Sequence, residues 1–340
     1  MSLPALVFVP FTGDGAAAVA RVPAGPGVGQ ILGPGGTSLL LAPSSNLRKW
    51  AASHLGLGKP PAPGRRPKTN LASVATAIGW AEADAPFRQR LLYERLVAPL
   101  VPLSSRRDLE PPAFLHLDPA HRFPRVSVRG VGEDGASLFG PFRDRRAAEK
   151  ARDALHRLFP LRPCDYAFEP DPGLPLGVGC LYAQVRSCAA PCLARVSEEA
   201  YRSLAAGAAA WLARPSAREE APPAVPATVA AQGARAVIVD VGRSAAVLYP
   251  VRQGRVLEQA AVSVRPGAVD AAVSRLAWPE PAGPGDWPWL ATWLRSPRGR
   301  ASYVLAADGD EALAAAVHAA LGRFAAPTPG GNVGAAQGEA

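Results

Sequence analysis

Four cysteines are the residues of this chain best suited to chemistry. They are the only cysteines among 340 residues and follow the pattern C-x15-C-x7-C-x3-C, as Cys164, Cys180, Cys188 and Cys192. Four thiolates at such spacings can bind a tetrahedral zinc ion or an iron-sulfur cluster, and the Pro and Gly residues between them leave the backbone free to wrap around it. Disulfide pairs or inert buried thiols are the alternatives, although no secretory signal points to an oxidising compartment.

The segments that flank the cysteines carry a family resemblance. They are Phe123-Pro-Arg125, Leu138-Phe-Gly-Pro-Phe142, Leu158-Phe-Pro-Leu-Arg-Pro-Cys164 and Cys180-Leu-Tyr-Ala-Gln-Val-Arg-Ser-Cys188-Ala-Ala-Pro-Cys192. In order and spacing they resemble the middle of the UvrC family of excinucleases. The resemblance runs from about Val22 to Leu212 and is strong from Phe114 onward. It implies an iron-sulfur cluster of the 4Fe-4S type on the four cysteines, while zinc stays open on spacing alone.

The same resemblance implies a degenerate nuclease lobe at the N-terminus. Members of the family begin with a GIY-YIG lobe in which tyrosines, an arginine and a glutamate surround one divalent cation. In this chain Gly29 and Leu40 stand at the tyrosine positions, and Pro43 stands at the usual lysine. Each lost base or electrostatic group is worth about 10² to 10³-fold in rate. We therefore expect endonuclease activity to be weakened or lost.

Two residues are candidates for residual catalysis. Glu94 aligns with the family's metal-binding glutamate and would hold a divalent cation only if the nuclease is active. Trp50 stands where the phosphate-binding arginine is expected, so Arg48, about half a turn away, would face the phosphate instead. His54 is a further candidate base. A lone glutamate or histidine on an amphipathic helix is more often a solvated surface residue.

Basic residues point to a nucleic-acid partner. The net charge is +9, and all but four of the 37 basic residues are arginine, whose planar guanidinium matches phosphate oxygens. A GC-rich genome gives the same bias, so clusters are more informative than the total. Arg106-Arg107 is one such cluster. The residues predicted to bind DNA are Arg65, Arg66, Lys68, Arg143, Arg145 and Arg146.

Composition and periodicity predict an α+β protein of three lobes. The predicted divisions are a small GIY-YIG-like α/β lobe at 1–110, a four-cysteine middle lobe with helices at 111–212, an Ala/Pro-rich linker at 213–235, a short β-rich C-terminal lobe at 236–326 and a disordered tail at 327–340. The C-terminal lobe resembles the approach to the family's ribonuclease-H-like nuclease domain. It is too short to contain that domain.

The elements that must position these residues follow from local patterns. Helices are predicted over 46–55, 71–80, 86–97, 145–158 and 311–321, and Ser197 is predicted to be the N-cap of another. Strands are predicted over 3–9, 27–41, 114–128, 136–142 and 236–264, with a turn at 133–135. The tryptophans between 278 and 293 are predicted to pack a core in preference to stacking on bases.

These observations predict a UvrC-like DNA-binding protein of nucleotide excision repair. DNA and other excision-repair proteins are the expected partners, with no membrane and no obvious small-molecule substrate. The N-terminal MSLPALVFVPF has no basic leading region and is predicted to be a buried strand, so the expected location is cytoplasmic. The alternatives are a noncatalytic, metal-stapled protein-interaction scaffold derived from the family, and a zinc-stapled protein of unrelated function.

Overall fold

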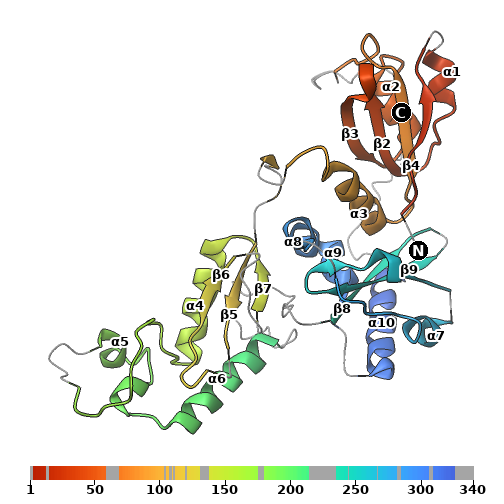
Figure 1. The fold of residues 1–340 in the computed structure, drawn as a ribbon. Coiled ribbons are helices and arrows are strands. Elements are labelled where there is room, and N and C mark those ends of the chain that lie inside the picture. Colours follow the sequence, from red (N-terminus) through yellow and green to blue (C-terminus); the bar gives the residue numbers. More distant parts are fainter. Residues whose placement is uncertain are drawn as a thin grey trace, which may run out of the picture.

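The computed structural model is a mixed α+β structure with three antiparallel sheets that follow one another along the chain (Figure 1). It describes residues 3–12, 15–58, 69–102, 105–106, 109, 112–118, 121–130, 138–174, 180–213, 235–243, 245–265, 267–281, 285–305 and 309–325. No helix within these ranges is long and apolar enough to cross a membrane. The predicted turn at 133–135, linker and tail lie wholly or almost wholly outside the described residues.

The N-terminal sheet has the strand order β1-β4-β2-β3. Its elements are β1 (Val7–Pro10), α1 (Gly15–Ala20), β2 (Gly27–Leu32), β3 (Ser38–Ser44), α2 (Leu47–His54), β4 (Ala77–Glu82) and α3 (Pro86–Val97). Helix α2 begins after Asn46, whose side chain accepts a hydrogen bond from the Lys49 amide. Helix α3 has Pro86 in its first turn, where proline lacks only an N–H that would be unpaired. The predicted helices over 46–55 and 86–97 are confirmed.

Helices α2 and α3 cover opposite faces of this sheet. Alternate residues of a strand point to opposite faces. Ile31 of β2 packs in one cluster with Trp50 of α2, whereas Val28, three residues earlier on the same strand, packs in another with Leu92 of α3. The two helices that carry the candidate residues Arg48 and Glu94 are therefore separated by the sheet.

The middle lobe is a three-stranded sheet, order β6-β5-β7, packed against helices. Its elements are β5 (Ala113–His116), β6 (Ser127–Arg129), β7 (Leu138–Phe142), α4 (Arg145–Leu158), α5 (Leu181–Gln184) and α6 (Glu198–Ala213). Asp144 caps α4, and the hydrogen bond from the Ala147 amide lowers the pKa of its carboxyl group. The Ser197 hydroxyl accepts a hydrogen bond from the Ala200 amide at the start of α6. The predicted helix over 145–158 and the Ser197 cap are confirmed.

The C-terminal sheet has the order β10-β9-β8-β12, with β11 also paired to β9. Its elements are β8 (Arg235–Val241), β9 (Ala246–Arg252), β10 (Arg255–Val256), β11 (Val262–Val264), α7 (Val269–Val273), α8 (Trp287–Arg295), α9 (Pro297–Ser302), β12 (Tyr303–Leu305) and α10 (Asp310–Ala325). Ile238 faces a core with Trp287 and Trp289, while Val237 and Val239 face a second core with α10. The predicted packing of the tryptophans in a core and the predicted helix over 311–321 are confirmed.

Three expectations differ from the structure. The helix predicted over 71–80 is wrong, because Ile78 and Trp80 alternate with smaller residues and form strand β4 with its buried face toward α2. The N-terminal strand is not buried, since Val7 and Phe8 of β1 are 56% and 46% exposed at the edge of the sheet. The C-terminal lobe is not mainly β, because α7, α8 and α9 accompany its strands.

The C-terminal lobe contacts both other lobes through one core. Phe87 of α3 stacks edge-on with Tyr249 at a ring distance of 5.2 Å, and Phe114 of β5 does the same with Trp287 at 5.2 Å. Figure 1 shows α3 between the N-terminal sheet and the C-terminal lobe. At its far end Arg95 donates to both carboxylate oxygens of the buried Asp286. Helix α3 therefore packs into two lobes at once.

Asp240 of β8 completes this junction at the start of α3. Its side chain is 2% exposed, and its two oxygens accept hydrogen bonds from the amides of Phe87 at 3.0 Å and Arg88 at 2.7 Å. Burial raises the pKa of Asp240 to about 6, although the two amide donors act in the opposite direction. The Asp240 carboxylate thus caps helix α3 of the N-terminal lobe, and its removal from water costs free energy.

We expect this site to make stability depend on pH. The folded state keeps the Asp240 proton up to about pH 6, whereas the unfolded chain releases it near pH 3.8. The protonated Asp240 therefore contributes to the free energy of unfolding in full below the unfolded pKa, and this contribution is lost as pH rises through the folded pKa. The stability of wild type relative to Asp240→Asn should be about 2 kcal/mol greater near pH 4.5 than near pH 7.5 in urea unfolding. A difference that does not change with pH would contradict the raised pKa.

Candidate metal centre and nucleic-acid interface

The four cysteines lie on the segment that leaves α4 and returns to α6. Cys164 follows α4 in an extended stretch, Cys180 precedes the short helix α5, and Cys188 and Cys192 flank a left-handed residue, Ala190, with φ 54°. All four are free thiols. We call residues 164–192 the cysteine segment. Residues 175–179 within it lie outside the described part of the chain.

Cys188 is the most enclosed of the four. Its side chain is 7% exposed, and its sulfur accepts a hydrogen bond from the Ala190 amide at 3.3 Å. Burial raises the pKa of Cys188 to about 11, and the electrostatic effect of Cys164, Cys180 and Cys192 adds to the increase. The three other cysteines therefore lie close enough to Cys188 to affect its pKa.

The four sulfurs are not arranged as a complete set of metal ligands. Among the described residues, no three or more His, Cys, Asp or Glu side chains are grouped closely enough to hold a metal ion. The chemistry of the donors still suits a thiolate-bound centre, because four sulfurs share one segment and the buried one receives an amide hydrogen bond of the kind that supports thiolate ligands. Binding of iron or zinc here stays a prediction.

Arg162 fixes the start of the cysteine segment. This buried guanidinium donates to the carbonyl oxygens of Phe123 at 2.9 Å and Tyr166 at 2.7 Å, and its backbone amide donates to the hydroxyl of Tyr201 at 2.7 Å. The Tyr201 hydroxyl in turn donates to the carbonyl of Pro124. These hydrogen bonds join the residues before β6, the start of the cysteine segment and helix α6. Sequence reasoning missed this role, although Arg162 lies in the motif that precedes Cys164.

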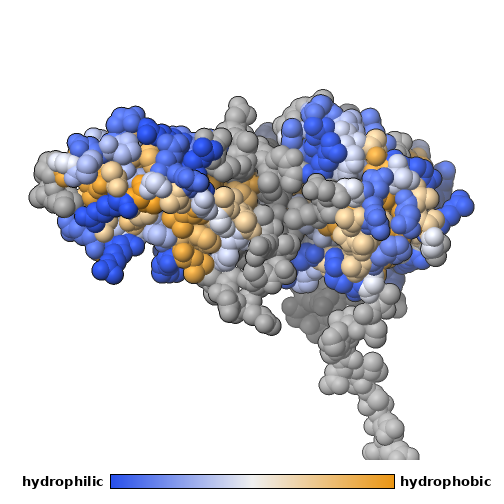
Figure 2. Space-filling view, turned by 90° about the horizontal axis from the view of Figure 1, so that it is seen from below, coloured by the Kyte–Doolittle hydropathy of each residue, from blue (hydrophilic) through white to orange (hydrophobic). Residues whose placement is uncertain are grey.

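The predicted DNA-binding arginines at the start of α4 lie on the surface. Arg143, Arg145 and Arg146 are all exposed, and the first two pair with Asp144 and Glu149 on the same exposed surface. Exposed pairs of this kind contribute little and exchange readily. Figure 2 shows hydrophilic and hydrophobic surface interleaved on the lobe at the left, which contains these residues. Arg65, Arg66 and Lys68 lie outside the described residues.

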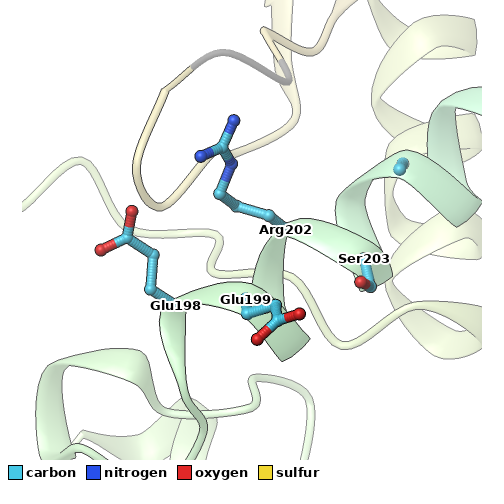
Figure 3. Close-up of a pocket in the computed structure, with 5 residues that line it drawn as sticks. Glu198, Glu199, Arg202 and Ser203 are labelled. Carbon is cyan, nitrogen blue, oxygen red and sulfur yellow. The ribbon is translucent and has the colours of Figure 1, made fainter.

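A shallow hollow on α6 is less suited to DNA. Figure 3 shows that Glu198 and Arg202 extend to the same side of the helix, with Glu199 and Ser203 beside them. Glu198 also accepts a hydrogen bond from Arg122 at 2.7 Å. Two carboxylates against one arginine in this lining would repel phosphate. We therefore leave this hollow out of the candidate interface.

In the N-terminal lobe, Trp50 fills the space beside Gly29. A Cβ atom at Gly29 would lie 2.3 Å from the Trp50 ring, so no side chain fits at position 29 unless the ring moves. Trp50 is 6% exposed and packs against the N-terminal sheet. Gly29 and Trp50, which were predicted to stand where the family has a tyrosine and an arginine, thus form one packed unit.

Glu94 is held in a buried ion pair. Its side chain is 4% exposed; its oxygens accept from Arg106 at 2.9 and 3.2 Å and lie 2.5 Å from Arg90. Arg106 is itself buried, so the predicted phosphate contact of the Arg106-Arg107 cluster does not hold for Arg106. A cation would have to displace these guanidinium groups to reach Glu94. The sequence signal that could have indicated an ion pair here was the i,i+4 spacing of Arg90 and Glu94 on the amphipathic helix α3.

Arg48 and His54 lie on the other helix, α2. The Arg48 side chain is exposed, and its Nε donates to the carbonyl of Val22 at 2.7 Å. The His54 ring lies 5.7 Å from that of Trp50. Because α2 and α3 cover opposite faces of the sheet, the structure does not bring Arg48 together with Glu94. Their proposed catalytic roles stay predictions.

Comparison with known proteins finds similarity that includes the middle lobe. Residues 113–211 match the family model described as UvrC/Cho excinuclease, middle domain. The UvrABC system protein C of Geobacter metallireducens is 32% identical over 198 residues, which cover 56% of this chain and 30% of that protein. The corresponding protein of Gluconobacter oxydans is 30% identical over 196 residues, covering 57% and 30%. No solved structure matches.

The matched regions include the cysteine segment and the exposed arginines of α4. This chain spans about 30% of the length of these relatives. The similarity to the UvrC/Cho excinucleases thus includes the middle domain at 113–211, and the similarity to the two UvrABC system proteins C extends over 56% and 57% of this chain.

Proposed function

We propose that this chain is a DNA-binding protein of nucleotide excision repair that does not cut DNA itself. The observation that carries the proposal is the UvrC/Cho middle domain at 113–211, which presents Arg143, Arg145 and Arg146 together on its surface. Arginine forks at an exposed helix start suit the phosphate backbone of a duplex. Other excision-repair proteins are the proposed partners.

The N-terminal lobe supports a noncatalytic role. Gly29 stands at the expected tyrosine position, where Trp50 leaves no room for a side chain, and Glu94 pairs with the buried Arg106 and the partly exposed Arg90. General-base and electrostatic groups are then missing from a site that needs both. Incubation with magnesium or manganese and a damaged duplex should give no incision by wild type. Incision that disappears in Glu94→Ala would restore the nuclease interpretation.

The cysteine segment would hold an iron-sulfur cluster through Cys164, Cys180, Cys188 and Cys192. A cluster bound by four thiolates supplies a cross-link between distant parts of an irregular loop. The residues around it have separate tasks: Arg162 fixes the start of the segment, and the Ala190 amide orients the Cys188 sulfur. The proposed role of the cluster is structural support of the DNA-binding domain.

DNA binding can be tested through the three arginines around the start of α4. We expect replacement of Arg143, Arg145 and Arg146 by glutamine to weaken duplex binding and to lower the slope of log K against log salt by up to about 3, since each lost phosphate contact removes about 0.9. Fluorescence anisotropy of a labelled duplex measures both. The matched control replaces three exposed arginines of the C-terminal lobe, Arg265, Arg275 and Arg323.

The control variant distinguishes the loss of a specific binding surface from a general effect of lower net charge. It removes the same net charge and should leave most of the affinity and the salt slope unchanged. An equal loss in both triple variants, or no duplex affinity in wild type at moderate salt, would contradict the proposal. In the second case, capture of a repair protein without DNA would favour the scaffold alternative.

A further inference from the structure

A second hollow lies between the end of α4 and the cysteine segment. It has a volume of about 480 Å³ and is lined by Arg152, Asp153, His156, Arg157, Pro163, Tyr182, Val185, Arg186 and Ser187. This size falls in the range of sites that bind small molecules or single groups of a larger ligand, which is about 300 to 1,000 Å³. We call it the α4 hollow. Nothing in the proposed duplex surface at the start of α4 uses these residues.

The charge of the α4 hollow is positive. Three arginines line it against a single carboxylate, and that carboxylate, Asp153, already pairs with Arg152 at 2.9 Å. Arg157 and Arg186 are both exposed and come from two different elements, α4 and the cysteine segment. Guanidinium groups that face one hollow from two elements favour an anionic ligand with several oxygens, such as a phosphate.

The inner wall adds an unsatisfied polar group. The Nε2 atom of His156 is buried and has no hydrogen-bond partner among the described residues. Burial, with a further effect of Arg152, lowers the pKa of His156, so its ring is neutral near pH 7 and adds no charge of its own. A buried polar atom without a partner is costly, and a polar ligand is one way to satisfy it.

The outer wall carries an exposed aromatic ring on a strained turn. Tyr182 is 44% exposed, and its carbonyl accepts hydrogen bonds from the amides of Ser187 at 2.9 Å and Cys188 at 3.2 Å. That closure requires Arg186 to adopt a left-handed backbone with φ 57°, which is unfavourable for any residue other than glycine. The chain thus places arginine at a position where glycine would be less strained, beside an exposed tyrosine.

We propose that the α4 hollow binds an unpaired nucleotide of DNA, with its phosphate between Arg157 and Arg186 and its base on the ring of Tyr182. This proposal rests on the proposed function and assigns it a second contact, distinct from the duplex surface. A base can stack on tyrosine only when it is not enclosed in a duplex, so the ligand is single-stranded. Such a site would distinguish opened or gapped DNA from intact duplex.

The test uses the full chain and a labelled single-stranded oligonucleotide in fluorescence anisotropy. Arg186→Gly removes the guanidinium and relieves the left-handed strain, so its thermal stability should equal or exceed that of wild type. Its affinity for the single strand should fall about tenfold, with a salt slope lower by about 0.7. Arg157→Gln should have the same effect. Arg202→Gln, on the exposed face of α6, is the matched control.

Tyrosine variants test stacking separately from charge. Tyr182→Ala should lower single-strand affinity about 5- to 100-fold, and Tyr182→Phe should stay within about twofold of wild type, because phenylalanine keeps the ring. Duplex affinity should change little in either. A protein partner at this hollow would instead be lost from Tyr182→Ala while single-strand affinity stayed unchanged, and that result would overturn the proposal.

The outcomes separate this proposal from the proposed function. If wild type binds DNA but Arg186→Gly, Arg157→Gln and Tyr182→Ala bind the single strand as tightly as wild type, the α4 hollow is not the site and the proposed function stands. If Arg202→Gln loses as much affinity as the hollow variants, the effect is general charge and the site is overturned. If wild type binds neither duplex nor single strand, both proposals fail.

Discussion

Replacing Cys188 with serine is expected to prevent binding of the proposed iron-sulfur cluster and to unfold the cysteine segment. Cys188 is the buried sulfur of the four, and its amide hydrogen bond already orients it as a ligand. Metal binding at structural thiolate sites contributes folding free energy of about 10 kcal/mol or more, so a chain that loses a ligand loses much of this support. Protein prepared without oxygen should be brown, with about four iron atoms for each wild-type chain, and the variant should be colourless.

Ser187→Ala is the control for this experiment, because Ser187 lies beside Cys188 and its hydroxyl donates to the Tyr182 carbonyl. It should keep both the colour and the iron. A wild-type protein that contains zinc and has no visible absorption would replace the cluster with a zinc site. A protein with neither metal, or a serine variant with as much iron as wild type, would remove the metal centre from the proposed function.

Local sequence patterns were sufficient to predict the helices whose ends carry clear signals. The Asn46, Asp144 and Ser197 caps mark helix starts because a side-chain oxygen meets unpaired amides, and α3 ends as its apolar spacing ends. Strand β4 was missed because its alanines favour a helix and its glycine is unfavourable in a strand, so local preference points away from the observed structure. Its pairing with β1 and β2, far apart along the chain, sets its structure.

The candidate site was less predictable because it depends on contacts between distant residues. Glu94 could be found by its place in a motif, but its neutralisation by Arg106 depends on how the chain folds back after α3. Asp240 caps a helix that lies 152 to 153 residues away in sequence, and no local pattern contains that information. The cysteines, by contrast, were found at once, since their clustering in one segment is itself local.

We expect Arg162→Met to destabilise the middle domain by about 3 kcal/mol. Methionine keeps much of the apolar length but leaves the carbonyl oxygens of Phe123 and Tyr166 without their charged donor in a buried site. The start of the cysteine segment would then no longer be held against the strand region. Urea unfolding of the variant measures the loss, and its iron content reports whether the position of Cys164 has changed.

Two further variants show whether the effect belongs to the buried network. Arg122→Met removes an arginine that also lies over the Phe123 ring, at 5.2 Å, but whose guanidinium is exposed and pairs with exposed glutamates. Its loss should have a much smaller effect, because exposed ion pairs are weak. Tyr201→Phe keeps the ring and removes the acceptor of the Arg162 amide, with an expected cost of about 1 to 2 kcal/mol. Equal stability of Arg162→Met and Arg122→Met would show that the network does not hold the segment. A large loss in Arg162→Met and Tyr201→Phe alone would place the support of the four cysteines in these few hydrogen bonds.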